Sequence, residues 1–271
     1  MNAPFRQPGT PLDPGAPINR GLVGWWPMWE GAGGKTLDIS GKNNHGTLTN
    51  EPLWSGGGLK FDATNDWVDV GADVRPSLPV SIHVRCMFRS TSAAGGLFAS
   101  DKTNISTIIH SGFVLSQGFI TAGKIALFYG DNTANNSTGR RTKSGTTTPS
   151  NNVVHSITGV IRGATDMSIW LNGIDDGGTY SGTGGSMVYR NDSGAIGMYS
   201  DTGGTLRVVN GNIFDCRVWS RALSALEVQQ LYVNPNIGLW VPDITRYYFA
   251  AAAGGADVRR KIIPAYMRFA A

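Results

Sequence analysis

The sequence predicts an all-β protein built as a two-sheet antiparallel sandwich, with one short helix near its C-terminal end. Glycine accounts for 37 of the 271 residues and charged residues for only 15%, a composition richer in turn formers and poorer in charge than that of an average domain. Glutamate, a good helix former, occurs only at positions 30, 51 and 227. Short segments of alternating apolar and polar residues recur between clusters of Gly, Asn, Asp and Ser.

The first element is a proline-rich stretch. Residues 1–20 carry five prolines, three or four positions apart, which favours an extended, polyproline-like segment without a core of its own. We therefore expect an extended N-terminal arm, followed by a sandwich over residues 21–233. The arm holds no apolar segment typical of a signal peptide, and the chain has no run of 18 apolar residues. We expect neither a signal peptide nor a membrane span.

The sandwich segment consists of alternating stretches bounded by turn formers, which is the pattern of strands in a β-sandwich. Asn172-Gly173 interrupts one such stretch and predicts a tight hairpin. The polar segment 131–152 is typical of either a loop or a twisted hairpin at the sandwich edge. The alternating stretches are LKFDA, DWVDVG, VSIHVRCMF, KIALFYG, VVHSITGVI, MSIWLNG, GAIGMYS and NIFDCRVW.

One helix is predicted within SRALSALEVQQLY. Ser224 as N-cap and Glu227 three residues later form the pattern of a capping box, and Leu223 is placed to contact Val228. The helix is expected to end before Pro235. Beyond it, residues 234–271 change to an Ala-rich and basic composition, and we interpret them as a C-terminal arm outside the sandwich.

The net charge of +4 comes from the two ends of the chain. Residues 21–240 contain 16 basic and 16 acidic residues, so the pI near 9.1 gives no reason to expect a nucleic-acid groove on the sandwich. The candidate attachment residues are the basic residues of the C-terminal arm: Arg246, Arg259, Arg260, Lys261 and Arg268.

Four blocks of the sequence resemble laminin-G-like domains, which have the concanavalin A-like jelly-roll fold. In chain order they are GLVGWWPMWEGAGGKTLDISGKNNHGTL, LKFDATNDWVDVG, HSITGVIRGATDMSIWLNGIDDG and IFDCRVWSRALSALEVQQLY. The resemblance covers about residues 21–233 and implies a jelly-roll sandwich. It implies little about function, because this fold carries lectins, enzymes and structural modules. More loosely, one such domain followed by NPNIGLW and a tail ending RRKIIPAYMRF resembles phage and prophage virion proteins.

The same resemblance raises the question of calcium in the loop KTLDISGKNNHGTLTN, residues 35–50. In related domains an Asp of this loop can help to hold a structural Ca²⁺, which takes six to eight oxygen ligands. The candidate ligands are Asp38, Asn43 and Asn44, with Asp215 from the last strand. Phe214 stands where family members often carry an Asp, which weakens this interpretation.

The alternative for this loop, and the one that we favour, is a hydrogen-bonded turn. Asp38 and Ser40 would accept backbone N–H groups, while Gly41, Asn43 and Gly46 would adopt positive φ. No other cofactor is expected.

Histidine and cysteine give no spacing typical of zinc. His45 has no candidate partner ligands nearby, so we expect a packed or hydrogen-bonded loop residue. Cys86 and Cys216 lie in strand-like segments. We expect two buried thiols, with a disulfide between them as the alternative.

Glycoside hydrolysis requires two carboxylates roughly 5–10 Å apart. Jelly-roll glucanases, which this fold resembles, carry E-x-D-x-x-E on one strand, and that motif is absent here. The Asp pairs in WVDVGAD and GIDDGG are typical of strand ends and turns. Neither a G-x-S-x-G elbow nor a P-loop occurs. We therefore expect no enzymatic activity.

Glycan binding is expected at exposed tryptophans, because sugar rings stack on aromatic faces. Trp29 and Trp54 are the candidates, and the alternative for each, more common for tryptophan, is a structural packing role. The four tryptophans of the matched blocks are expected to be core residues: Trp26, Trp67, Trp170 and Trp219.

These features together suggest a non-enzymatic phage structural protein, a decoration protein of the capsid or tail surface that attaches through its arms and displays a glycan-binding sandwich. Its expected partners are major capsid or tail proteins, glycans and further copies of the chain, without nucleic acid or membrane. Its expected location is the virion, after synthesis in the host cytoplasm. The first alternative is a free-standing carbohydrate-binding module, and the second is a glycoside hydrolase.

Overall fold

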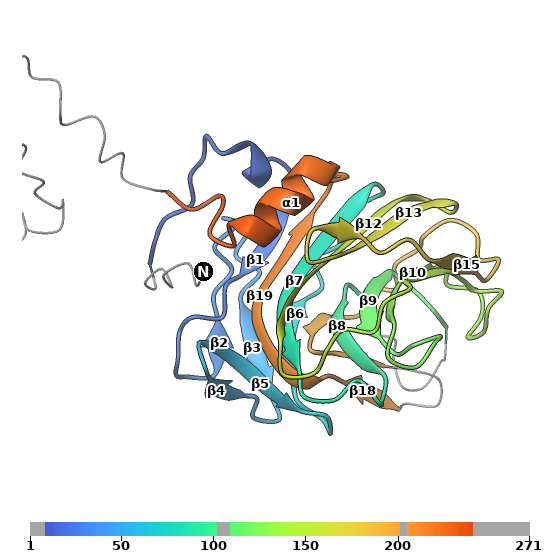
Figure 1. Cartoon of the computed structure of the whole chain (residues 1–271), viewed down its shortest axis with the longest axis horizontal. Helices are drawn as coiled ribbons and strands as arrows, with labels where there is room; N and C mark the ends of the chain where they lie inside the picture. The colour runs from blue at the N-terminus through green and yellow to red at the C-terminus, as the bar shows by residue number, and fades with distance from the viewer. Residues whose placement is uncertain (1–8, 102–108, 201–204, 241–271) are drawn as a thin grey trace, which may run out of the picture.

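The computed structural model describes residues 9–101, 109–200 and 205–240. It consists of two β-sheets packed face to face, with helix α1 (Ala225–Val233) on the outer side of the first sheet (Figure 1). The predicted two-sheet sandwich with one short helix is thus confirmed. Within these residues, no helix has the length and apolar character needed to cross a membrane.

The first sheet has eight strands in the order β14-β13-β12-β7-β19-β5-β4, and β1 also pairs with β19. All its pairings are antiparallel. The strands are β1 (Leu22–Trp26), β4 (Leu53–Ser55), β5 (Gly58–Asp62), β7 (Val80–Phe88), β12 (Val154–Gly163), β13 (Asp166–Leu171), β14 (Ile174–Asp175) and β19 (Asn210–Trp219).

The second sheet has eleven strands in the order β15-β11-β10-β9-β8-β16-β6-β3-β2, with β17 and β18 beside β8. The contact of β18 with β8 is parallel and the other pairings are antiparallel. The strands are β2 (Lys35–Thr36), β3 (Gly46–Thr49), β6 (Trp67–Gly71), β8 (Gly95–Ala99), β9 (Phe113–Gln117), β10 (Ile125–Gly130), β11 (Arg140–Ser144), β15 (Thr179–Ser181), β16 (Gly194–Ile196), β17 (Met198–Ser200) and β18 (Leu206–Val208).

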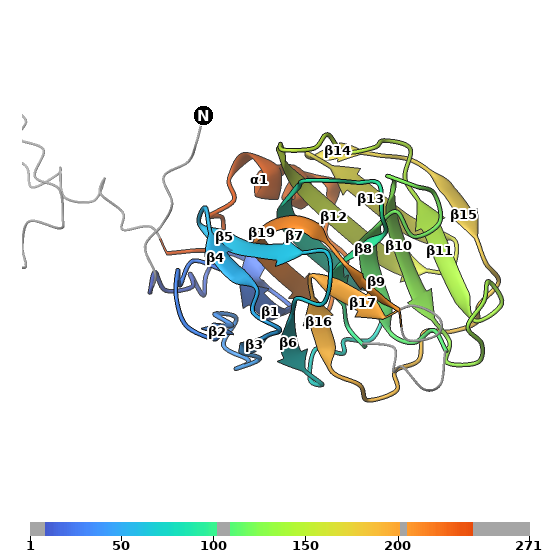
Figure 2. The same cartoon turned by 90° about the horizontal axis from the view of Figure 1, so that it is seen from below.

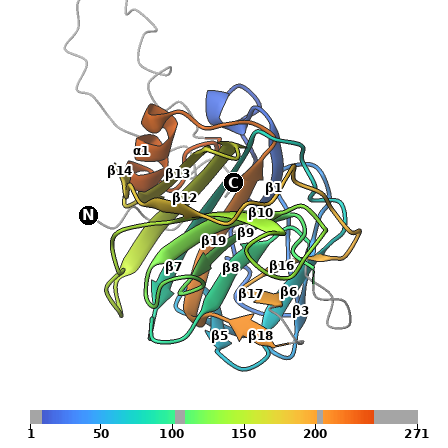
Figure 3. The same cartoon turned by 90° about the vertical axis from the view of Figure 1, so that its right-hand side faces the viewer.

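The main core lies between the two layers, which Figure 3 shows from the end where β9 and β10 lie. Alternation along β7 shows how the sequence builds it. Val84 and Cys86 point into the core, so His83 and Arg85 lie on the outer face.

Cys216 is also a core residue, but it lies opposite Val84 and not opposite Cys86. Both thiols are free and buried, and burial raises the pKa of each.

Local signals in the sequence are realised as predicted. The turn at Asn172-Gly173 has positive φ at both residues, 53° and 76°, as a two-residue hairpin requires. Helix α1 begins with the predicted capping box between Ser224 and Glu227. The segment 131–152 contains β11, which pairs with β10 on one side and with β15 on the other.

Helix α1 packs on a second apolar cluster, on the outer face of the first sheet (Figure 2). Val228 and Leu231 are 1% exposed and lie there with Trp219 from β19. The tryptophans expected in the core are buried or packed against it, Trp170 at the edge of this second cluster.

Segments on either side of the predicted sandwich also join this second cluster. Ile18, in the short helix η1 (Pro17–Asn19), is 3% exposed, and Leu239 is 4% exposed. Leu12 pairs with Leu239 in an isolated antiparallel bridge. The indole of Trp219 donates a 2.7 Å hydrogen bond to the carbonyl of Ile18. Residues 9–20 and 234–240 therefore belong to the packed unit, which extends beyond the predicted limits of 21 and 233.

Candidate functional site

The loop 35–50 is organised around the carboxylate of Asp38. Oδ1 accepts hydrogen bonds from the backbone N–H groups of Trp25, at 2.9 Å, and Ser40, at 2.8 Å. Oδ2 accepts from the Ser40 hydroxyl, at 2.8 Å, and the Asn44 N–H, at 3.0 Å. The Asp38 N–H in turn donates to Nδ1 of His45, at 3.1 Å. Four donors thus satisfy this carboxylate, and His45 is the hydrogen-bonded loop residue that was predicted.

Two of the candidate calcium ligands, Asp38 and Asp215, use both carboxylate oxygens to accept hydrogen bonds within the protein. The side-chain amide of Asn44 donates to the Val23 carbonyl, while Asn43 is an exposed residue with φ of 62°. Asp215 accepts bonds from Trp25 and Arg217. Among the described residues, no cluster of three or more His, Cys, Asp or Glu side chains could hold a metal ion. The arrangement fits the hydrogen-bonded turn.

One detail of the predicted turn is wrong. Gly41 and Asn43 have positive φ, as expected, but Gly46 does not. Gly46 lies in β3, where a Cβ atom would come within 2.4 Å of the Val68 side chain. Its lack of a side chain serves close packing and not a turn.

Asp215 forms a buried ion pair that ties the C-terminal segment to the first sheet. The Nε of Arg217 donates a 2.7 Å hydrogen bond to Oδ2 of Asp215. The same guanidinium lies 3.7 Å from the ring centroid of Trp25 and donates to the carbonyls of Pro235 and Ile237. Burial raises the pKa of Asp215, and the charge of Arg217 opposes that rise.

Trp29 and Trp54, the two predicted glycan-binding residues, line one surface groove. The groove has a volume of about 180 Å³. Trp29 lies in the loop after β1 and Trp54 in β4, and both side chains are half-buried. The Trp54 indole donates a 2.7 Å hydrogen bond to the Gly33 carbonyl, which fixes the ring. The remaining lining residues are Met28, Gly31, Ser55, Gly56, Gly57 and Gly58.

Glycines keep the floor of this groove open. Ser55 pairs with Gly58 across the β4–β5 hairpin, and the two turn residues Gly56 and Gly57 have φ of 64° and 78°. This tight turn suits glycine. Without side chains, the turn leaves backbone polar groups accessible beside two aromatic rings, an arrangement suited to a flat ligand with hydroxyl groups.

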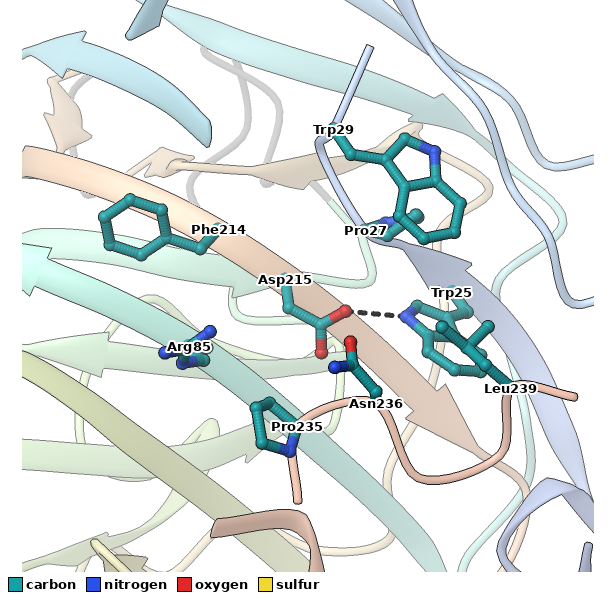
Figure 4. Close-up of a pocket in the computed structure, with 9 residues that line it drawn as sticks. All are labelled: Trp25, Pro27, Trp29, Arg85, Phe214, Asp215, Pro235, Asn236 and Leu239. Atoms are coloured by element: carbon teal, nitrogen blue, oxygen red, sulfur yellow. Dashed lines mark hydrogen bonds between the residues drawn. The ribbon is translucent and has the colours of Figure 1, made fainter. Parts of the chain in front are cut away.

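Trp29 also lines a second hollow (Figure 4). This hollow is small, about 40 Å³. Asp215 lies at its centre with Arg85 on one side and Trp25 on the other. The remaining lining residues are Pro27, Phe214, Pro235, Asn236 and Leu239. Arg85 was not among the residues predicted from the sequence, although the alternation of SIHVRCMF places it on the outer face of its strand.

The carboxylates of the two Asp pairs noted in the sequence mostly accept hydrogen bonds in turns and loops. Among the described strands of the second sheet, the one acidic residue is Asp69, whose Oδ1 accepts from the Gly71 N–H. Asp175 accepts in the same way from Gly177, and Asp176 from the loop at Thr146. Asp69, Asp175 and Asp176 thus serve local turns and loop contacts.

The outer face of the second sheet carries an aromatic cluster. Phe119, from the loop after β9, stacks on Phe128 of β10 at 4.4 Å between ring centroids. Tyr199 and His110 contact these rings edge-on. Phe128 is 2% exposed, so this part of the face is covered.

A family model described as the concanavalin A-like lectin/glucanases superfamily matches residues 62–229, more than half of the chain. The chain belongs to this superfamily. The match confirms the resemblance inferred from the four sequence blocks. No curated protein sequence matches the chain.

Solved structures with the same fold are distant in sequence. Trypanosoma rangeli sialidase in complex with sialic acid is 13% identical, with a TM-score of 0.54 over 80% of this chain and 33% of the sialidase. The receptor-binding domain of botulinum neurotoxin D is 15% identical, with a TM-score of 0.55 over 80% and 54%. The binding domain of Paraclostridial Mosquitocidal Protein 1 is 13% identical, with a TM-score of 0.54 over 79% and 52%. The chain spans about a third of the sialidase and about half of each toxin domain, and the likeness concerns the fold.

Proposed function

We propose that this protein is a non-enzymatic structural protein of a phage virion, a decoration protein on the capsid or tail surface. It attaches through its terminal segments and presents a glycan-binding sandwich. Attachment through these segments is supported by the contact between the two ends of the described unit. The N–H of Asp13 donates to the Gly238 carbonyl, and the N–H of Trp240 donates to the Pro11 carbonyl, each at 2.8 Å.

This pairing matters because residues 1–8 and 241–271 then continue from one point on the sandwich. Two segments that start together can both contact the same neighbouring subunit. The basic residues proposed for attachment, Arg246, Arg259, Arg260, Lys261 and Arg268, lie outside the described residues.

The Trp29–Trp54 groove supports the glycan-binding part of the proposal. Two half-buried indoles and an open glycine turn offer stacking surfaces and backbone hydrogen-bond partners. The turn-bound carboxylates and the covered outer face of the second sheet support a role without catalysis. A free-standing carbohydrate-binding module is the second candidate, because this groove requires no partner chain.

A truncation separates the two candidates. Full-length protein and a 9–240 fragment would be compared by cryo-EM of virions assembled with each, by light scattering and on a glycan array. We expect the full-length protein to occupy the virion as a symmetric oligomer. We expect the fragment to be lost from virions while it keeps its glycan binding.

Incorporation of the fragment at wild-type level would refute attachment through the terminal segments. A monomeric full-length protein that binds glycans but is absent from virions would establish the free-standing module instead.

A further inference from the structure

The small hollow beside Trp29 is lined by a second cation, Arg85, next to the ion pair of Asp215 and Arg217. Arg85 lies on the outer face of β7, opposite Asp215 of β19 in the strand register. Both oxygens of Asp215 already accept short hydrogen bonds, from Arg217 at 2.7 Å and from Trp25 at 2.6 Å. In the described part of the chain, the guanidinium of Arg85 makes neither a hydrogen bond nor an ion pair. Two guanidinium groups therefore face one carboxylate, which leaves one positive charge.

A buried hydroxyl group without a partner lies next to Arg85. Ser156 is the direct neighbour of Arg85 across the β7–β12 ladder, on the same face. It is 7% exposed, and its Oγ makes no hydrogen bond. A buried hydroxyl without a partner is unfavourable.

The size of the hollow limits what can enter it. Its volume of about 40 Å³ holds a group of two or three heavy atoms, since one water molecule needs roughly 10–15 Å³ by the same measure. A sugar ring does not fit, but a carboxylate does. Trp29 lines this hollow and also the larger groove with Trp54, so a ring stacked on Trp29 can direct a substituent toward Arg85.

We propose that this site selects acidic saccharides: the ring stacks on Trp29 and the carboxylate enters the hollow to pair with Arg85. This inference rests on the proposed glycan-binding function and adds the chemical class of the ligand. Hydrogen bonds between a guanidinium and a carboxylate are charge-assisted and are stronger than neutral ones. A neutral sugar would leave the cation unpaired, so the acid should bind about tenfold to a hundredfold more tightly than its neutral counterpart.

A matched pair of ligands tests the charge directly. Trigalacturonic acid and its methyl ester share the same rings and differ in the charge of the carboxyl groups. Their dissociation constants would be measured by calorimetry at pH 7 and low salt, together with a glycan array that pairs uronic-acid and sialic-acid glycans with neutral analogues. We expect wild-type protein to prefer the acids on both readouts.

Variants then locate the preference. Arg85→Gln should bind acid and ester equally, at the wild-type affinity for the ester, and Arg85→Lys should retain part of the preference. Arg89→Gln, an equal charge change at an exposed residue just beyond the same strand, should keep the full preference. Trp29→Ala should weaken the binding of both ligands.

Wild-type protein that binds glycans without preferring the acidic forms would overturn this inference and leave the glycan-binding function in place. Undiminished acid preference in Arg85→Gln would overturn the assignment of Arg85. Absence of binding to every glycan, acidic or neutral, would overturn the inference and the glycan-binding function together. The comparison of acid with ester on wild-type protein needs no variant to fold.

Discussion

Replacement of Arg217 by Met should strongly destabilise the fold. Arg217 is 1% exposed. Its guanidinium pairs with Asp215 at 2.7 Å, stacks on Trp25 and donates to two backbone carbonyls of the C-terminal segment. Met conserves much of the volume but removes the charge and the donors. Asp215, 6% exposed, would then stay buried as an anion without its closest partner.

The expected loss follows from the broken ion pair. Of the two guanidinium groups that face Asp215, only that of Arg85 would remain, and it makes no hydrogen bond to the carboxylate. Removing one partner of a buried ion pair costs about 3–5 kcal/mol. At roughly 2–4 °C per kcal/mol for a domain of this size, the melting temperature should fall by about 6–20 °C. Differential scanning calorimetry and urea unfolding at pH 7 measure both quantities.

A second substitution isolates the cause. In Arg217→Met with Asp215→Asn, the amide oxygen can still accept from the Trp25 indole, but no charge is buried, so at least half of the lost stability should return. The single Arg217→Met variant should also regain stability below pH 7. When the pKa of an acid is higher in the folded state than in the unfolded state, the folded protein binds more protons between these two pKa values. The free energy of unfolding therefore falls as the pH rises from the unfolded-state pKa through the folded-state pKa. A loss below about 1 kcal/mol, or a double variant as unstable as the sum of its parts, would refute this reasoning.

Three further outcomes are expected. A fragment of residues 21–233 should melt below a 9–240 fragment in calorimetry, because it lacks the apolar side chains that both flanking segments bury; equal melting temperatures would contradict the extended boundary. Gly96→Ala should destabilise by several kcal/mol in urea unfolding, about the limit for single substitutions, because its Cβ would lie 2.3 Å from the backbone of Met198. Gly163→Ala, whose Cβ meets no atom within 4 Å, is the control and should be near neutral. Both cysteines should resist a thiol reagent in the native protein and react after unfolding, since burial raises their pKa values and blocks access; native labelling would show that the strands open.

Local sequence signals carried most of the fold prediction. Asn172-Gly173 specifies a turn that needs positive φ at two successive residues, and Ser224 with Glu227 specifies a helix start. Each signal operates within a few residues, so tertiary structure does not have to be known. Alternation within β7 likewise assigns each side chain to the core or to the outer face.

Contacts between residues that lie far apart in the sequence were not predictable in the same way. Pro spacing indicates an extended chain near Ile18, but nothing local shows that Leu239 closes over the same cluster, 221 positions later in the sequence. Trp29 and Trp54 could be chosen as candidates by elimination. That they share a groove follows from the β4–β5 hairpin, which places Trp54 against the loop at Gly33.

The bridge between Leu12 and Leu239 also determines how the sandwich responds to force. Because the two strands of this bridge are antiparallel and both ends leave it on the same side, pulling the ends apart loads its hydrogen bonds one after another, as in a zipper. Such a geometry opens at low force, whereas strands pulled along their length share the load. Tension between the two ends would therefore release the flanking segments before it reaches the sheets. The bridge would open first under load, and the sandwich beyond it would stay folded.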